Sequence, residues 1–183
     1  MDAKVATVTV FCGSRAGRDP RYLEAADELG RRLAEAGCKI VYGGASVGLM
    51  GALADSALHA GGEVIGVIPE HLVSLEVAHD NLTEQRVVSD MHIRKATMME
   101  LGDAFVALPG GAGTFEEWFE VFTWKMLRLH QKPCAFLDIG GFYKPLAAFL
   151  DHVCSEGFIP SEIRDDIKVF PDVERYLESI ELA

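Results

Sequence analysis

The chain has 183 residues, of which 49% are hydrophobic and 25% are charged. This length and composition predict one globular domain spanning residues 1–183, with a full core, and exclude a disordered chain. The formal net charge of −11 disfavours nucleic acids and anionic membranes as partners, because both repel an acidic protein.

Short apolar segments alternate with amphipathic segments along the chain. Continuous apolar runs of this length are typical of buried strands. The predicted strands are at residues 5–11, 40–42, 63–68, 85–89, 103–108, 133–138 and 167–170. The amphipathic segments are predicted helices at residues 19–37, 46–60, 90–102, 114–129, 142–154 and 172–180. Residues 70–83 show neither pattern and are expected to be irregular.

Capping residues mark the ends of two predicted helices. Asp19 and Pro20 supply an N-cap and a first-turn proline for the first helix, and Gly37 supplies its stop. Asp90 is the predicted cap of the third helix.

Strands that alternate with helices predict a parallel sheet with helices on both faces. The predicted fold is a single-domain α/β protein with a Rossmann-like, doubly wound parallel sheet. Right-handed crossovers place the strand-to-helix turns at one edge of such a sheet, where ligands bind. Three glycine-bearing turns follow strands, at residues 12–14, 43–48 and 109–114, and the topology predicts that they converge.

The third turn lies in the motif L-P-G-G-A-G-T-F-E-E, residues 108–117. Glycines let the backbone approach a ligand closely, and the N-terminus of the following helix attracts an anion. Glu116 and Glu117 lie in the first turn of that helix. An anion site beside acidic groups indicates chemistry on a phosphorylated molecule; first-turn acids that merely suit the helix dipole are the alternative.

Two common nucleotide-binding signatures are incomplete. Gly43 and Gly48 have the spacing of a P-loop, but Leu49 and Met50 stand where lysine and serine or threonine are needed. The glycine run of the third turn ends in Glu116, whose charge opposes a pyrophosphate. ATP hydrolysis and NAD binding are therefore disfavoured, and no cofactor is expected.

A second motif, M-H-I-R-K-A-T-M, follows Asp90. Its residues Met91, Arg94, Lys95 and Met98 share one helical face. One interpretation is two core methionines beside two solvated cations. The other is a basic pair that binds an anion near the helix start, where the dipole otherwise disfavours cations.

The cysteines Cys12, Cys38, Cys134 and Cys154 form no C-x-x-C pair, which predicts free thiols in a reducing compartment. The histidines do not cluster with zinc-type spacing, so no metal site is expected. No apolar stretch reaches membrane-spanning length, and the N-terminal residues lack a signal-peptide pattern. A cytoplasmic protein is expected.

Together these segments resemble the LONELY GUY family, whose paired signature is P-G-G-x-G-T-x-x-E with M-H-x-R-K-x-x-M. Residues 109–117 and 91–98 match the two halves. The resemblance covers about residues 5–170 and includes further runs at residues 11–14, 46–51 and 141–143. The chain departs from the family at Ala45, where a third glycine is common, and at Ala112, where an aromatic residue is common.

The resemblance implies hydrolysis of the N-glycosidic bond of an adenine-type nucleoside 5′-monophosphate, AMP or a prenylated AMP, without a cofactor. The products are the free base and ribose 5-phosphate. Glu117 is implied as the carboxylate that stabilises the sugar cation and activates water, and Arg94 as its catalytic partner. The implied substrate-binding residues are Ser14, Gly44, Glu76, Met91, Arg94, Lys95, Gly110, Gly111, Gly113, Thr114, Glu116 and Thr123.

Other functions stay open from the sequence. An AMP nucleosidase without cytokinin preference and a non-catalytic nucleotide-binding protein fit the same motifs. A pyridoxal-dependent decarboxylase, a label often given to this family, fits less well because Lys95 resembles a phosphate ligand. The helix from Thr114 is apolar on more than one side, which indicates either a central core helix or a homodimer interface.

Overall fold

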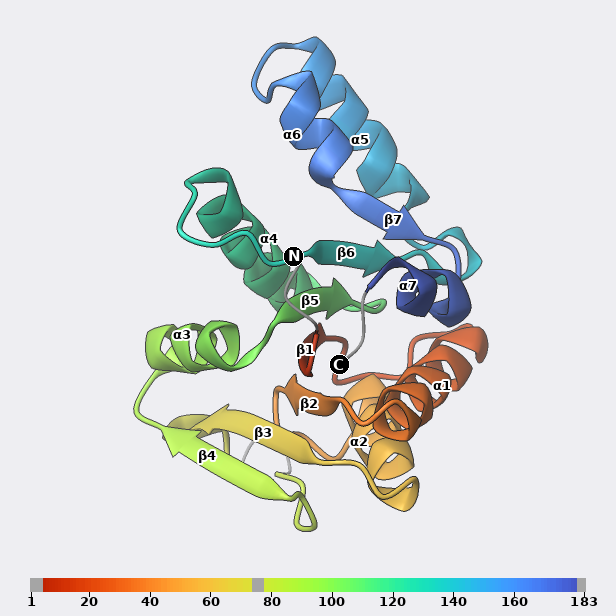
Figure 1. Ribbon diagram of the computed structural model, residues 1–183, viewed down its shortest axis with the longest axis vertical. Helices are drawn as coiled ribbons and strands as arrows, with labels where there is room; N and C mark the ends of the chain where they lie inside the picture. Colours follow the sequence, from red (N-terminus) through yellow and green to blue (C-terminus); the bar gives the residue numbers. More distant parts are fainter. Residues whose placement is uncertain (1–4, 74–77, 181–183) are drawn as a thin grey trace.

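The computed structural model describes residues 5–73 and 78–180; Glu76 lies outside the described residues. Over this part of the chain, a seven-stranded parallel sheet has the order β4-β3-β2-β1-β5-β6-β7 (Figure 1). The strands are β1 (Thr7–Phe11), β2 (Lys39–Tyr42), β3 (Val64–Pro69), β4 (Glu84–Val88), β5 (Ala104–Ala107), β6 (Cys134–Leu137) and β7 (Lys168–Phe170). Every predicted strand is confirmed.

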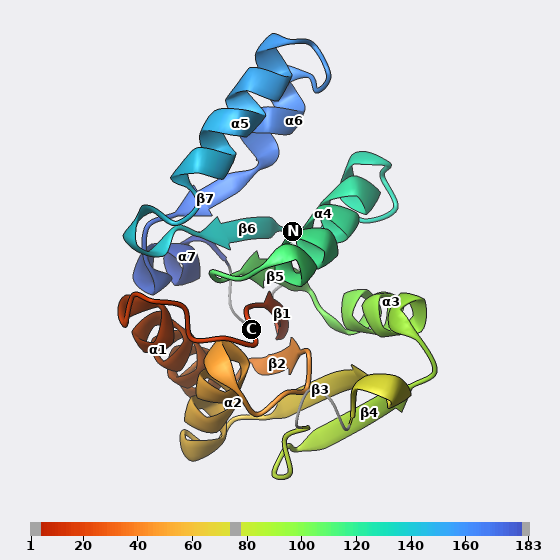
Figure 2. The same cartoon turned by 180° about the vertical axis from the view of Figure 1, so that it is seen from behind.

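Helices cover both faces of this sheet. The helices α1, α2 and α7 lie on one face and α3 and α4 on the other, whereas α5 and α6 extend beyond β7 (Figure 1 and Figure 2). Their bounds are α1 (Arg21–Glu35), α2 (Gly48–His59), α3 (Met91–Leu101), α4 (Ala112–Met126), α5 (Lys144–Ser155), α6 (Ser161–Asp166) and α7 (Val173–Ser179), with 3₁₀ turns η1 (Glu70–Leu72) and η2 (Ile139–Gly141). The predicted Rossmann-like, doubly wound fold is confirmed.

The predictions for α1 and α4 need correction, and α6 was not predicted. Helix α1 begins after Pro20, and the Asp19 carboxylate still accepts the Arg21 N–H at 3.0 Å. Helix α4 begins at Ala112, two residues before the predicted start, so Glu116 and Glu117 lie beyond its first turn and not in it as predicted. The helix ends before the predicted residue 129 because Arg128 adopts a left-handed φ of 61°. Helix α6 was not predicted, since none of its residues is buried and it has no apolar stripe.

Alternate residues of the central strand face two separate cores. Val8 and Val10 pack with α1 and α2, whereas Phe11 packs with α3 and α4. On the second face, Trp118 of α4 is fully buried and its indole N–H donates to the Ala135 carbonyl at 2.9 Å. This anchoring fixes α4, and therefore its N-terminus, relative to the sheet.

The sheet reverses its strand order between β1 and β5, and this point is where ligands bind in such folds. There the Gly13 N–H donates to the Pro109 carbonyl at 3.1 Å, so the loops after β1 and β5 contact each other. The start of α2 joins them, because the Leu49 N–H donates to the Gly13 carbonyl at 3.1 Å. The predicted convergence of the three glycine turns is confirmed.

Candidate functional site

A cavity of about 480 Å³ lies at this reversal point. Its walls come from the β1–α1 loop, the β5–α4 loop and the first turns of α2, α3 and α4, with Leu72 and Phe142 at its margin. The predicted site residues that line it are Ser14, Met91, Arg94, Gly110, Gly111, Gly113, Thr114, Glu116 and Glu117.

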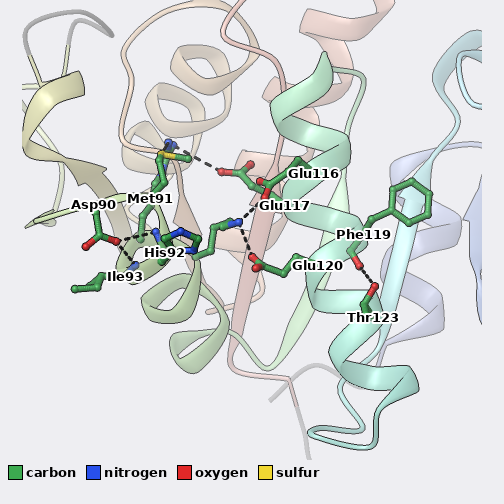
Figure 3. A network of polar contacts seen from close by, with 11 residues as sticks. Asp90, Met91, His92, Ile93, Glu116, Glu117, Phe119, Glu120 and Thr123 are labelled. Atoms are coloured by element: carbon green, nitrogen blue, oxygen red, sulfur yellow. Dashed lines mark hydrogen bonds and ion pairs between the residues drawn. The ribbon is translucent and has the colours of Figure 1, made fainter.

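Three predicted residues do not line this cavity. Gly44 packs its backbone against β3, where a Cβ would lie 3.3 Å from Ile68. Thr123 is exposed and donates its hydroxyl to the Phe119 carbonyl at 2.6 Å (Figure 3). It follows Thr114 by nine residues, or about 13 Å along the helix. Contacts of these residues with substrate stay predictions.

Lys95 is the third predicted site residue that does not line the cavity. Its ammonium is paired with Glu116 and with Glu120, the latter at 3.0 Å, both on α4. Burial alone lowers the pKa of Lys95, but the hydrogen bonds to Glu116 and Glu120 outweigh burial and raise that pKa above its ordinary value. The lysine therefore links α3 to α4 as a cation, instead of facing the predicted phosphate.

The N-terminus of α4 opens into the cavity. Gly111 occupies the N-cap position and has no side chain to cap the first N–H groups. A Cβ on Gly110 would lie 2.0 Å from Thr114 Oγ1, so packing requires glycine there. A Cβ on Gly111 or Gly113 would meet no atom within 4 Å. These two glycines face cavity space and leave backbone N–H groups accessible to an anion.

Helix α3 positions Arg94 on the opposite wall. The helix starts where predicted, because the Asp90 carboxylate accepts the N–H groups of His92 and Ile93, each at 2.9 Å (Figure 3). Arg94 is only 3% exposed, and its Nη2 donates to the Gly43 carbonyl at 3.1 Å. Within the described residues, its buried Nε has no hydrogen-bond partner. A buried donor of this kind is available to a ligand.

Glu117 faces Arg94 from α4. The two side chains form an ion pair with 3.9 Å between Nη2 and Oε1, and Glu117 is 7% exposed. Figure 3 shows Glu116 and Glu120 on the same helix, turned toward α3. The two neighbouring acids thus differ: Glu117 is a buried carboxylate in the cavity, whereas Glu116 is exposed and paired with Lys95.

The thiol beside this carboxylate is not a nucleophile. Cys12 lines the cavity and is buried. Burial, with a smaller contribution from the negative charge of Glu117, raises the pKa of the Cys12 thiol far above its ordinary value. A neutral thiol does not attack a substrate.

No group of three or more potential metal ligands occurs among the described residues.

Sequence analysis did not select several residues that line the cavity. Arg15 directly follows the predicted Ser14 in the β1–α1 loop, and its position next to Ser14 is the sequence feature that could have identified it as a cavity residue. Tyr22 and Phe142 pack edge to face, 5.6 Å between ring centroids, at the cavity margin. No sequence pattern identified them, since they come from distant segments.

The fold and the site together define a Rossmann-like α/β protein whose cavity is lined by the N-terminus of a helix and by a buried Arg–Glu pair. Residues 50–180 match a family model described as possible lysine decarboxylase. The chain also resembles cytokinin riboside 5′-monophosphate phosphoribohydrolases, and it belongs to the LONELY GUY family.

Three such relatives illustrate this similarity. A protein of Rhodococcoides fascians is 51% identical, covering 95% of this chain and 88% of the relative. A protein of Oryza sativa is 48% identical, over 95% of this chain and 72% of the relative. A protein of Arabidopsis thaliana is 44% identical, over 95% of this chain and 80% of the relative.

Solved structures share the fold at lower identity. The Moco carrier protein of Chlamydomonas reinhardtii has a TM-score of 0.72 at 24% identity, covering 97% of this chain and 95% of that protein. The molybdenum cofactor binding protein of Rippkaea orientalis has a TM-score of 0.69 at 22% identity, over 97% and 95% of the two chains. These similarities concern architecture alone.

No helix in the described segments is both long and apolar enough to cross a membrane.

Proposed function

We propose that this protein hydrolyses the N-glycosidic bond of adenine-type nucleoside 5′-monophosphates, including N6-modified ones, to give the free base and ribose 5-phosphate. The observation that carries the proposal is the buried Arg94–Glu117 pair, which shares one cavity with the open N-terminus of α4. The activity named for the relatives from three organisms supports it.

The proposed substrate binds with its 5′-phosphate at the N-terminus of α4. The N–H groups around Gly111 and Gly113 donate to phosphate oxygens, and the Thr114 hydroxyl completes the contact. Glu117 follows Thr114 by three residues, which places the two side chains about 5–6 Å apart on one helix face. A ribose ring bound by its phosphate therefore presents its anomeric carbon to the carboxylate.

The chemistry uses this carboxylate twice. As the bond between the anomeric carbon and the base nitrogen lengthens, positive charge develops on the sugar, and Glu117 stabilises it. The electron pair of the broken bond leaves with the base nitrogen. Glu117 accepts a proton from water, the hydroxyl bonds to the anomeric carbon, and the proton then passes from Glu117 to the base nitrogen, which restores the carboxylate. Arg94 orients the carboxylate and offers its Nε–H, which has no hydrogen-bond partner among the described residues, to the phosphate or the departing base.

The test is incubation of the purified protein with AMP and with isopentenyladenosine monophosphate, followed by chromatography. Release of free base with equimolar ribose 5-phosphate is expected. The ratio of kcat/KM for the two substrates measures base preference, to which Ala112 in the cavity wall contributes. Tight binding without base release would instead identify a non-catalytic nucleotide-binding protein.

Decarboxylation, suggested by the description of the family model, does not fit these residues. Pyridoxal phosphate needs a lysine for its Schiff base. Among the residues described, no lysine lines the cavity, and Lys95 is held by two carboxylates. An absorbance spectrum of protein incubated with pyridoxal phosphate should show no aldimine band.

We also propose a homodimer in the cytoplasm. Met126, Leu127 and Leu129, at and beyond the end of α4, are exposed apolar residues, and a second copy would cover them. No disulfide joins the four cysteines among the described residues, which suits a reducing compartment. Sedimentation tests the dimer, and fractionation of the source cells tests the location.

A further inference from the structure

Most charged side chains at the cavity are already occupied by protein partners. Arg94 is held by Gly43 and Glu117, and Glu116 is held by Lys95. Arg15 differs, because it lines the cavity and is exposed. Within the described parts of the chain, its side chain forms no hydrogen bond or ion pair. It is therefore a cation at the cavity without a partner among the described residues.

The backbone of Arg15 is nevertheless held firmly in place. A Cβ on Gly48 would lie 2.5 Å from Arg15 N, so the start of α2 packs directly on this residue. On the other side, a Cβ on Gly13 would lie 3.3 Å from both the Arg15 carbonyl oxygen and Gly110 Cα. The backbone of Arg15 is thus fixed beside the β5–α4 loop, while its guanidinium forms no hydrogen bond or ion pair with a described residue.

The site needs such a cation. A phosphate monoester carries about −1.5 to −2 charges near neutral pH, whereas a helix N-terminus offers only about half a positive charge. The cavity also contains two carboxylates, in a protein of net charge −11. Lys95, which the sequence motif suggested for this task, is neutralised by Glu116 and Glu120.

We propose that Arg15 binds the 5′-phosphate of the substrate and gives this site its preference for nucleotides over nucleosides. This inference rests on the proposed function, because it assumes a nucleoside monophosphate with its phosphate at the N-terminus of α4. The planar guanidinium provides two parallel donors to phosphate oxygens, an interaction for which arginine is well suited.

The experiment compares equilibrium binding of AMP and adenosine, measured by calorimetry in a Glu117→Gln background that prevents turnover. The variants are Arg15→Gln, Arg15→Lys and, as a matched control, Arg18→Gln. Arg18 is an exposed arginine of the same loop that does not line the cavity. Steady-state kinetics of Arg15→Gln with Glu117 intact accompany the binding measurements.

Arg15→Gln should weaken AMP binding about 10- to 100-fold, the range for a hydrogen bond between charged groups. Adenosine binding should change less than about twofold, Arg15→Lys should retain part of the AMP affinity, and Arg18→Gln should match its parent. Because the contact is made equally in ground and transition states, KM should rise while kcat stays nearly constant. The salt dependence of AMP binding should also become shallower.

Three outcomes would overturn the assignment: unchanged AMP binding in Arg15→Gln, equal losses for AMP and adenosine, or the same loss in Arg18→Gln. Failure of the proposed hydrolase function would give a different result from failure of the Arg15 assignment. If the wild-type protein released no base from AMP, the hydrolase proposal would fail, while the binding comparison would still decide whether Arg15 recognises phosphate.

Discussion

Arg94 Nη2 lies 3.9 Å from Glu117 Oε1, although the residues come from different helices and both are almost completely buried. A buried charge needs a partner, so each residue depends on the other for its stability as well as its position. The Gly43 carbonyl holds the guanidinium from a third element at 3.1 Å. Three elements of the fold therefore hold the Arg94–Glu117 pair in place.

Replacing Glu117 with glutamine should abolish turnover while largely preserving AMP affinity. The amide keeps the shape of the side chain but stabilises the sugar cation poorly and cannot accept the proton of water. The expected fall in kcat is at least about 10²- to 10⁴-fold, measured by base release and compared with AMP binding. Glu120→Gln is the control, since Glu120 lies one turn away outside the cavity lining. Near-normal turnover of Glu117→Gln would remove the catalytic assignment.

A methyl group at position 43 should disturb catalysis without touching the substrate. A Cβ on Gly43 would lie 2.4 Å from Arg94 Nη2 and 3.2 Å from the Met50 sulfur. Gly43→Ala should therefore displace the guanidinium, lower kcat/KM for AMP about 10-fold or more, and lower the melting temperature as the buried pair separates. Ala45→Gly, in the same loop but away from Arg94, is the comparison. Retention of full kcat/KM in Gly43→Ala would show that the position of Arg94 matters little.

The turns and the carboxylate were predictable from sequence because chain topology determines where they meet. Right-handed crossovers bring every strand-to-helix turn to one edge, so glycine turns far apart in sequence converge. The identity of the residue that faces the cavity was less predictable. Arg94 and Lys95 are adjacent, and neighbouring helical residues point about 100° apart. Only the packing of α3 against α4 decides that Arg94 enters the cavity and Lys95 does not.

The two adjacent carboxylates also show that sequence does not reveal which neighbouring residue is buried. Both were predicted in the first turn of a helix, but α4 begins at Ala112, so they lie one turn further along it. Sequence also does not show that Glu117 is buried while Glu116 pairs with Lys95. Arg15 was not predicted because it belongs to no motif, and the role proposed for it depends on the lack of a partner among the described residues. A charged residue without a partner can be recognised only once its neighbours are known.

Substitutions of two glycines at the start of α4 should have separate effects on AMP binding and on the stability of the fold. Gly113→Ala adds a methyl group that meets no protein atom within 4 Å, so the fold should be kept or stabilised by up to about 1 kcal/mol. The same methyl group enters cavity space and should raise KM for AMP. Gly110→Ala should instead lower the melting temperature, because its Cβ would lie 2.0 Å from Thr114 Oγ1. An unchanged KM in Gly113→Ala would mean that no ligand approaches this backbone.

The buried thiol in the cavity should make the folded state sensitive to alkaline pH. The ordinary pKa of the Cys12 thiol is 9.0. In the folded protein, burial and the negative charge of Glu117 raise this pKa far above 9.0. Above about pH 9 the unfolded chain releases this proton while the folded chain retains it, so the free energy of unfolding falls as pH rises. Cys12→Ala should show a shallower decline between pH 9 and 10.5 in urea titrations, compared with Cys154→Ala at a half-buried position. Iodoacetamide at pH 8 should leave both Cys12 and AMP hydrolysis intact, and rapid alkylation of Cys12 in folded protein would contradict the shift.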